Sequence, residues 1–259
     1  MRDKLEVYYN KFNEDKRLTR RHGNVEFQVT FDYILKYLGE PNAKRVADIG
    51  AGTGRYSIPL HQLGAKVVAV EPYKCNLNVL KEKEPNIEAY IGNAKNLKKL
   101  ADNDFDLVLL FGPMYHLSTT EEKLQALNEA KRIAKPNGII MIAYISNEYS
   151  VVMHGFKSHN VGKCVELGQL DENFHTQYTE SDLYSYSTPS DIDELLAKVD
   201  GLTRINIFGA DGPSEYMRKE INEMSDDEYQ TFINYVKHIA ERPDLIGASA
   251  HIVDVVKKI

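Results

Sequence analysis

Two acidic residues and three glycines near the start of the chain have the types and spacing that suit nucleoside binding. Asp48 is followed by Gly50, Gly52 and Gly54 at alternate positions, and Glu71 comes 21 residues after Gly50. Glycine has no Cβ, so the backbone can take positive φ and a ligand can come close to it. A carboxylate at the end of a strand can accept both hydroxyls of a ribose. These residues predict a pocket for a nucleotide-like ligand.

Tyr115 and His116 are the second pair of residues with chemical potential. They follow an apolar run at residues 105–111, which reads as a buried strand. In an open α/β sheet ligands bind beyond the carboxyl ends of the strands, so residues 111–116 are expected to line the pocket. An imidazole can exchange a proton near pH 7, and a tyrosine can stack on a substrate or hydrogen-bond to it. The alternative is that His116 only orders its loop.

The elements that position these residues alternate between short apolar strands and amphipathic helices. Alternation of this kind predicts parallel strands joined by right-handed crossovers. Strands are predicted at residues 46–49, 66–71, 87–91, 105–111, 139–145, 202–208 and 251–256, and helices at 25–38, from 53 onward, and at 75–83, 120–134, 189–199, 214–223 and 226–241. Residues 135–138 read as a turn. Ser190 is a predicted N-cap, and Thr119 and Ser225, each with a glutamate three residues later, predict capping boxes.

The motif Asp48-x-Gly50-x-Gly52-x-Gly54, with Glu71, Asn93 and the strand at 105–111 in order, resembles the class I S-adenosylmethionine-dependent methyltransferases. The dinucleotide fingerprint G-x-G-x-x-G would need a glycine where Arg55 stands. The resemblance implies a Rossmann-like α/β fold. Its sheet has seven mostly parallel strands with helices on both faces, and the last strand is antiparallel.

The resemblance also implies the cofactor S-adenosylmethionine, with S-adenosylhomocysteine as product. In that family the turn at Asn93 often holds an acid that accepts from the adenine amino group, and an asparagine can also accept there. Candidate cofactor-binding residues are Asp48, Gly50, Ala51, Gly52, Gly54, Glu71, Pro72, Asn93, Ala94 and Phe111, and the candidate catalytic residues are His116 and Tyr115.

Three regions are predicted: an N-terminal helical cap at residues 1–44, a core at 45–145 and 189–259, and an insertion at 146–188 that forms a lid. Residues 166–200 hold nine acidic residues and one lysine, with Phe174, Tyr178, Tyr184 and Tyr186 among them. Carboxylates and aromatic rings together can receive a cationic substrate. The alternative is a solvated acidic lid.

Composition narrows the classes of function. The 259 residues are 42% hydrophobic and carry a net charge of −6, which disfavours a polyanion partner. No apolar run is long enough for a membrane span, and the two cysteines provide no disulfide framework. His154, His159 and Cys164 match no metal-site spacing, so no metal is predicted. We expect a cytoplasmic monomer or homodimer.

The predicted function is methyl transfer from S-adenosylmethionine to an O or N nucleophile of a small molecule. One alternative is RNA methylation, with Lys16, Arg17, Arg20 and Arg21 contacting phosphate. A second is a non-catalytic module that binds S-adenosylmethionine. An NAD-dependent oxidoreductase ranks last because Arg55 replaces the third glycine of its fingerprint.

Overall fold

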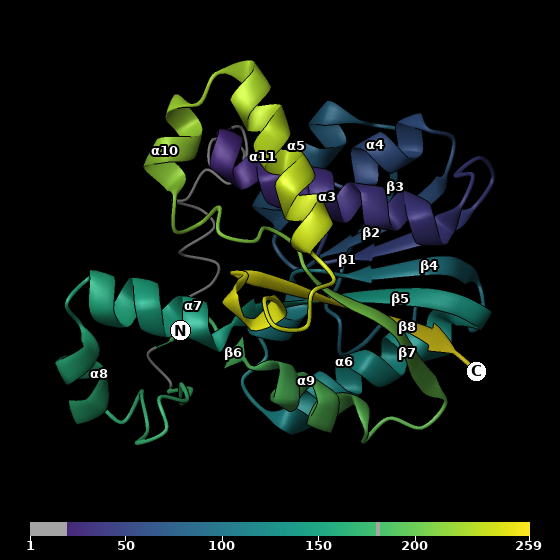
Figure 1. Ribbon diagram of the computed structural model, residues 1–259. Coiled ribbons are helices and arrows are strands. Elements are labelled where there is room, and N and C mark those ends of the chain that lie inside the picture. Colours follow the sequence, from purple (N-terminus) through teal and green to yellow (C-terminus); the bar gives the residue numbers. More distant parts are fainter. Residues whose placement is uncertain (1–19, 180–181) are drawn as a thin grey trace.

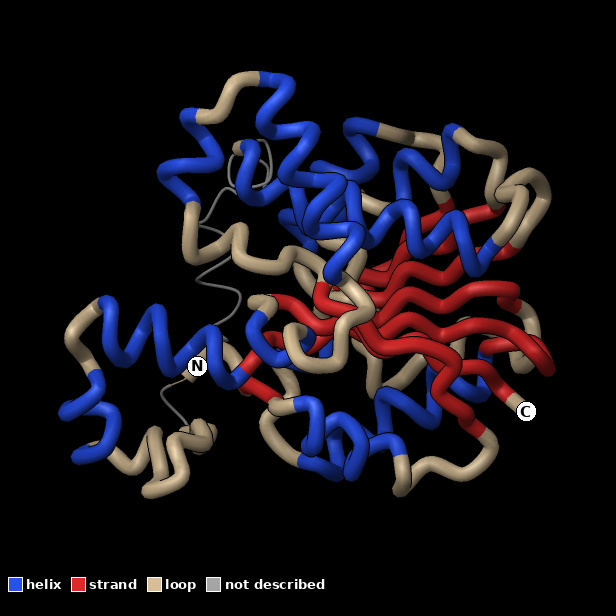
Figure 2. Tube along the Cα trace, in the orientation of Figure 1, coloured by secondary structure: helices blue, strands red, loops and turns tan. Residues whose placement is uncertain are grey.

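A single mixed sheet lies between two layers of helices in the computed structural model, which describes residues 20–179 and 182–259 (Figures 1 and 2). The strands are β1 (Arg45–Ile49), β2 (Lys66–Glu71), β3 (Glu88–Ile91), β4 (Phe105–Leu110), β5 (Ala134–Ser146), β6 (Tyr186–Ser187), β7 (Leu202–Gly209) and β8 (His251–Lys258). Their order is β3-β2-β1-β4-β5-β8-β7, with the short β6 beside β5. β8 is antiparallel to both of its neighbours, and the pairs from β3 to β5 are parallel, as predicted.

Each face of the sheet has its own apolar core because the strands are buried on both sides. One core joins β1, β2 and β4 to α3 (Arg21–Leu38), α4 (Ser57–Gln62), α5 (Lys74–Lys83) and α11 (Asp226–Ile239). The other joins the same strands to α6 (Thr120–Ile133) and α9 (Pro189–Leu196). Figure 1 shows these two helical layers on opposite faces, with the short α10 (Arg218–Glu223) beside α11.

The insertion after β5 starts with α7 (Asn147–Ser150) and a π-helical segment at Val151–Lys157, followed by α8 (Val161–Glu166). In Figure 1, α7 and α8 extend to one side, away from the sheet. The chain returns through β6, whose Tyr186 pairs with Ile145 at the end of β5. No helix in the two described ranges is both long and apolar enough to cross a membrane.

Several predicted boundaries were wrong, and each has a local cause. The helix expected from residue 53 begins at Ser57, because Gly54 has a φ of 91°, outside the helical region. The N-cap of α9 is Thr188 and not Ser190; Pro189 takes the first helical position, where its missing N–H costs nothing. The helix expected from 214 begins at Arg218, after a series of turns.

Two further expectations needed partial correction, and one was confirmed. The turn expected at 135–138 lies within β5, where the pairing with β4 shifts register. Thr119 caps α6 by accepting from the N–H of Glu122, but the Glu122 carboxylate accepts from the Ser118 N–H rather than from Thr119. The capping box of Ser225 and Glu228 forms in full. Residues 1–19 of the predicted N-terminal cap lie outside the described residues.

Candidate functional site

A cavity of about 660 Å³ lies at the carboxyl ends of β1, β2 and β4. The predicted residues that line it are Asp48, Gly50, Ala51, Gly52, Glu71, Pro72, Asn93, Ala94, Phe111, Tyr115 and His116. The parallel register aligns the ends of β1 and β4 through the pair Ile49 and Leu110, so the loops after both strands meet. The structure thus brings together the residues that were predicted from the sequence to bind cofactor or to act in catalysis. Gly54 is the exception.

Gly50 and Gly52 each require a glycine, but for different structural reasons. Gly50 has a φ of 81°, and a Cβ there would lie 2.8 Å from Cδ of Pro113 and 3.3 Å from Cα of Gly112. The loops after β1 and β4 therefore touch through Gly50. Gly52, with a φ of 56°, has open space where its Cβ would project, and its N–H donates to the Glu71 Oε2 atom at 2.9 Å.

Gly54 does not line the cavity. Its φ is 91°, and a Cβ would lie 3.0 Å from the side chains of Ile58 on α4 and Leu80 on α5. The residue therefore lets two helices approach the turn closely. Within the described part of the chain, its contribution to the site is one of packing.

Glu71 is fixed in place by three donors. Its Oε1 atom accepts from the Tyr73 N–H at 3.2 Å and from the Asn76 amide at 3.1 Å, and its Oε2 atom accepts from Gly52. The side chain is almost fully buried. Burial raises the pKa of Glu71, and the bonds from Gly52, Asn76 and Tyr73 oppose that rise. The carboxylate is oriented before any ligand arrives.

Asp48 ties the end of β1 to the start of α4. Its Oδ2 atom accepts from the Ser57 hydroxyl at 2.6 Å, and the side chain is almost fully buried. Burial raises the pKa of Asp48 to about 6, and the nearby Glu71 carboxylate adds to the rise. The acid expected to bind cofactor is thus also a structural anchor of the glycine turn.

Asn93 and Phe111 form other parts of the wall. The Asn93 Oδ1 atom accepts from the Lys95 N–H at 3.1 Å, so its side chain closes a local turn. The ring of Phe111 meets Tyr56 edge to face with centroids 5.0 Å apart. An apolar wall and a polar turn therefore frame the cavity on two sides.

The loop after β4 fastens the insertion to the core. His116 Nδ1 lies 3.0 Å from the Leu183 carbonyl, which can only accept, so Nδ1 carries the hydrogen. The Ser185 N–H donates to the Tyr115 carbonyl at 2.7 Å, and the Tyr184 ring lies 5.2 Å from the His116 ring. His116 therefore orders its loop, and this tautomer makes Nε2 the basic nitrogen.

Sequence reasoning missed Glu26 and its neighbours. Glu26 lies on α3, lines the same cavity as the glycine turn, and its Oε2 atom is 3.8 Å from Nδ1 of His251. That imidazole bonds to Asp211 at 2.7 Å. β8 is antiparallel, so its first residue, His251, lies at the carboxyl edge of the parallel strands beside Ile145. Only the strand order could have revealed this group.

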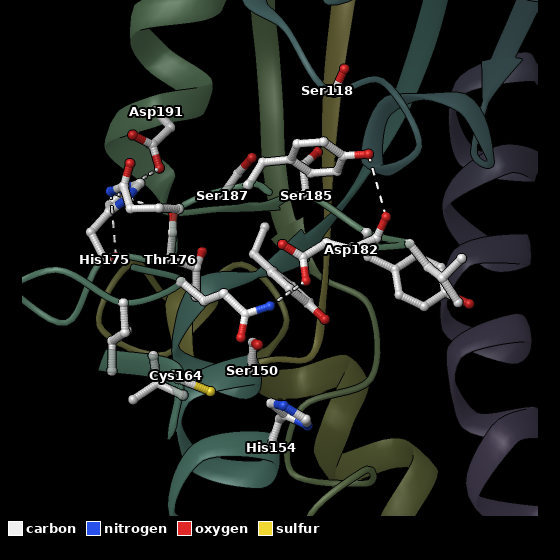
Figure 3. Close-up of a pocket in the computed structure, with 18 of the residues that line it drawn as sticks. Ser118, Ser150, His154, Cys164, His175, Thr176, Asp182, Ser185, Ser187 and Asp191 are labelled. Atoms are coloured by element: carbon white, nitrogen blue, oxygen red, sulfur yellow. Dashed lines mark hydrogen bonds and ion pairs between the residues drawn. The ribbon is translucent and has the colours of Figure 1, made fainter. Parts of the chain in front are cut away.

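A second cavity, of about 670 Å³, lies between the insertion, α6 and α9 (Figure 3). Three of the four predicted aromatic residues, Tyr178, Tyr184 and Tyr186, line it, and Phe174 does not. Asp182 accepts from Gln169 at 2.7 Å, and Figure 3 shows His175 directed at Asp191, 2.9 Å away. The predicted group of acids and rings is therefore separate from the glycine turn.

Comparison with known proteins supports the assignment of this fold. The sequence profile of a family described as "Methyltransferase domain" matches residues 47–142. The chain is 34% identical over 114 residues to the demethylmenaquinone methyltransferase of Renibacterium salmoninarum, which is 44% of this chain and 46% of that protein. The chain spans less than half the length of the first curated relatives that it matches.

Two solved structures share the fold over almost the whole chain. One is an S-adenosylmethionine-dependent methyltransferase of Thermotoga maritima, described as a possible histamine N-methyltransferase, with a TM-score of 0.61, 21% identity and coverage of 98% of both chains. The other is phosphoethanolamine N-methyltransferase 1 of Haemonchus contortus, bound to phosphoethanolamine and S-adenosylhomocysteine, with a TM-score of 0.60, 19% identity and coverage of 98% of this chain and 47% of that one. Residues 47–142 therefore match a methyltransferase domain, and the chain has the fold of S-adenosylmethionine-dependent methyltransferases.

Proposed function

We propose that the protein transfers the methyl group of S-adenosylmethionine to an O or N nucleophile of a small molecule. The observation that carries the proposal is the single cavity with the glycine turn and Glu71 on one side and Tyr115 and His116 on the other. Gly52 leaves open space that any side chain would fill, and Glu71 presents an oriented acceptor for a ribose. The described residues thus fit the cofactor. The small-molecule names of the relatives point the same way.

The cofactor supplies a sulfonium that already activates the methyl group, so the main task of the chain is alignment. Holding two reactants in line can contribute about 7–11 kcal/mol in favourable cases. Gly52, Glu71 and Asn93 are proposed to bind the nucleoside. The Tyr115 ring is proposed to position the acceptor. The insertion, fastened to this loop through Ser185, is proposed to exclude water.

His116 is proposed as a general base for an acceptor that must lose a proton. A well-placed base contributes roughly 10²–10⁴-fold to the rate. Nδ1 is committed to the Leu183 carbonyl, which leaves proton exchange to Nε2. The substitution His116→Gln should lower turnover at least 10-fold and alter the pH profile of turnover. Unchanged turnover from pH 6 to 9 would show that His116 is not the base.

The acceptor class is tested with methyl-labelled S-adenosylmethionine and a cell extract. After incubation with purified protein, the extract is separated into small molecules, RNA and protein. Label in the small-molecule fraction is the expected result. Label in RNA or protein would contradict the proposed acceptor class. If the protein binds S-adenosylmethionine but transfers no label from it, the non-catalytic module becomes the better explanation.

Part of the basic cluster argues against the RNA alternative. Arg21 is engaged inside the molecule: its guanidinium donates to the carbonyls of Met224 and Ser225 and pairs with Asp226. Lys16 and Arg17 lie outside the described residues.

Three further expectations stay predictions. They are the domain boundaries at residues 44, 146 and 188, the monomeric or homodimeric state, and the cytoplasmic location.

A further inference from the structure

Glu26 differs from the other acids of the cofactor cavity in its contacts. Asp48 accepts from Ser57, and Glu71 accepts from three donors, so both carboxylates serve the turn itself. Glu26 is half-buried on α3, and the ion-pair contact found for it among the described residues is the 3.8 Å approach to His251. A carboxylate that lines a cavity without a close hydrogen bond of this kind retains capacity to accept from a ligand.

Two of the cations that line the cavity, Lys95 and Arg55, have close contacts away from Glu26. Lys95 is paired with Glu122 at 2.5 Å. Arg55 donates to the carbonyl of Gly23 and lies over the Phe27 ring, 4.6 Å from its centroid. Both side chains are thus drawn toward other partners. Because the acids Asp48 and Glu71 line the cavity together with Glu26, this wall can accommodate an added positive charge.

Aromatic rings line the same cavity as Glu26. Tyr56 and Phe111 line it and contact one another edge to face, and Tyr115 lines it from the loop after β4. Rings and a carboxylate in one partly desolvated cavity are the groups that recognise an organic ammonium, through cation–π attraction and a charge-assisted hydrogen bond. A neutral alcohol would gain much less from them.

A buried network supports Glu26 from behind. The His251 imidazole lies between Glu26 and Asp211, and Asp211 in turn accepts from the Ser249 hydroxyl and the His251 N–H. Burial works against a charge on His251, but the carboxylates of Glu26 and Asp211 raise its pKa to about 9. At neutral pH the imidazolium, bonded to Asp211, therefore attracts the Glu26 carboxylate electrostatically from 3.8 Å away.

We propose that the methyl acceptor is a small amine and that Glu26 is the residue that selects it, with His251 and Asp211 as positioning residues. This inference rests on the proposed function. In the transfer, the bound ammonium first gives one proton to the proposed base, Nε2 of His116. The nitrogen lone pair that this leaves forms the new N–C bond, while the electron pair of the breaking S–C bond stays on sulfur. The sulfonium becomes a thioether, and the product nitrogen carries the positive charge until it releases a proton to solvent. A carboxylate beside the amine stabilises that charge.

The test compares the wild-type protein with Glu26→Gln, in which the amide keeps the shape and loses the charge. Glu40→Gln, an exposed carboxylate just beyond α3, is the matched control. Each protein is incubated with methyl-labelled S-adenosylmethionine and the deproteinised extract. Residual S-adenosylmethionine, itself a labelled cation, is first removed by chromatography. The labelled products are then passed over a cation exchanger at acidic pH, where carboxylates are neutral and amines are retained. Affinity for S-adenosylhomocysteine is measured in parallel by calorimetry.

We expect the labelled product to be retained as a cation. Glu26→Gln should label at least 10-fold more slowly at low acceptor concentration, with affinity for S-adenosylhomocysteine within twofold of wild type. With the isolated acceptor, the loss should lie mainly in KM, and Asp211→Asn should show a smaller rise in KM. A product that passes the exchanger, or equal labelling by Glu26→Gln and Glu40→Gln, would overturn the inference. Absence of small-molecule label with the wild-type protein would instead overturn the proposed function.

Discussion

The two cavities of the molecule are nearly equal in volume, about 660 and 670 Å³, but they are built differently. The cavity at the glycine turn is made mostly by short loops that follow β1 to β4, with Glu26 added from α3. The second cavity is made by side chains of the insertion that meet α6 and α9 across long sequence separations (Figure 3). The loop at 113–117 and residues 183–185 join the two.

This contrast shows which kind of site can be predicted from a sequence. A wall made of backbone depends on glycines at fixed positions, as at Gly50 and Gly52, because only they permit the required φ and the close approach. A wall made of distant side chains depends on how the insertion folds back, and the pairing of His175 with Asp191 is one of the contacts involved. The comparison predicts that changes in the first wall affect cofactor binding and changes in the second do not.

The largest effect is expected for Gly50→Ala. The added Cβ would lie 2.8 Å from Pro113 at a φ of 81°. Strain and overpacking together should lower the free energy of unfolding by about 3 kcal/mol, and affinity for S-adenosylhomocysteine should fall at least 100-fold. Denaturant unfolding and calorimetry measure both. Gly162→Ala is the control, because nothing lies within 4 Å of its Cβ position and it belongs to the insertion. Equal losses of stability and of affinity in the two variants would contradict the proposed difference between the two cavities.

A pH-dependent effect is expected from the network behind Glu26. The pKa of His251 is raised to about 9 in the folded protein by Glu26, Asp211 and Glu215, against the effect of burial. The stabilisation is therefore complete below pH 6.5 and is lost as the pH rises through 9, about 3 kcal/mol in total. Asp211→Asn should reduce this loss by more than half in urea unfolding measured at pH 6, 7.5 and 9. The same slope in both proteins would contradict the assigned charge.

Glu71→Gln tests the oriented acceptor of the cofactor cavity. The amide loses one charged acceptor, and hydrogen bonds to charged groups contribute about 1.5–3 kcal/mol. Affinity for S-adenosylhomocysteine should therefore fall about 10- to 100-fold. The free energy of unfolding should also fall, by about 1–3 kcal/mol, because the amide nitrogen cannot accept the hydrogen bonds that one of the two carboxylate oxygens accepts. Glu82→Gln on the exposed face of α5 serves as control. Unchanged affinity would show that Glu71 does not contact the ligand.

The smallest effect is expected for His175→Gln in the second cavity. The pair with Asp191 is partly exposed, so its removal should cost less than about 1 kcal/mol. Burial lowers the pKa of His175, but the bond to Asp191 outweighs it, and the net pKa is raised. The pair thus contributes most below pH 6.5. Limited proteolysis should cut the insertion faster in this variant at pH 6, with affinity for S-adenosylhomocysteine unchanged. A matching loss of affinity would mean that the two cavities are coupled.

Much of the fold was predictable because its signals are local. The apolar runs at 66–71 and 105–111 predicted the strands β2 and β4 to within one residue, and the glycines after Asp48 predicted the turn that follows β1. Errors arose where one residue overrode a pattern: positive φ at Gly54 delayed a helix, and Pro189 moved a cap to Thr188. The short β6 carried no periodic signal, because two residues are too few to show one.

The candidate site was predictable only in part, for a topological reason. Residues after consecutive parallel strands meet at one edge, so Gly52, Glu71 and His116 could be grouped from the chain alone. Glu26, Asp211 and His251 lie on α3, after β7 and at the start of β8. These three residues come together only because β8 lies antiparallel between β5 and β7. No local sequence pattern predicts that arrangement.

The most direct test of the account is methyl transfer by the purified protein with labelled S-adenosylmethionine and the small-molecule fraction of an extract, compared with Gly52→Ala. The open space at Gly52 is where the added methyl group would enter the cavity. The account predicts that wild-type protein moves label into the small molecules and that the variant loses at least 10-fold of this rate while it remains folded. Equal label with both proteins, or none with the wild-type protein, would contradict it.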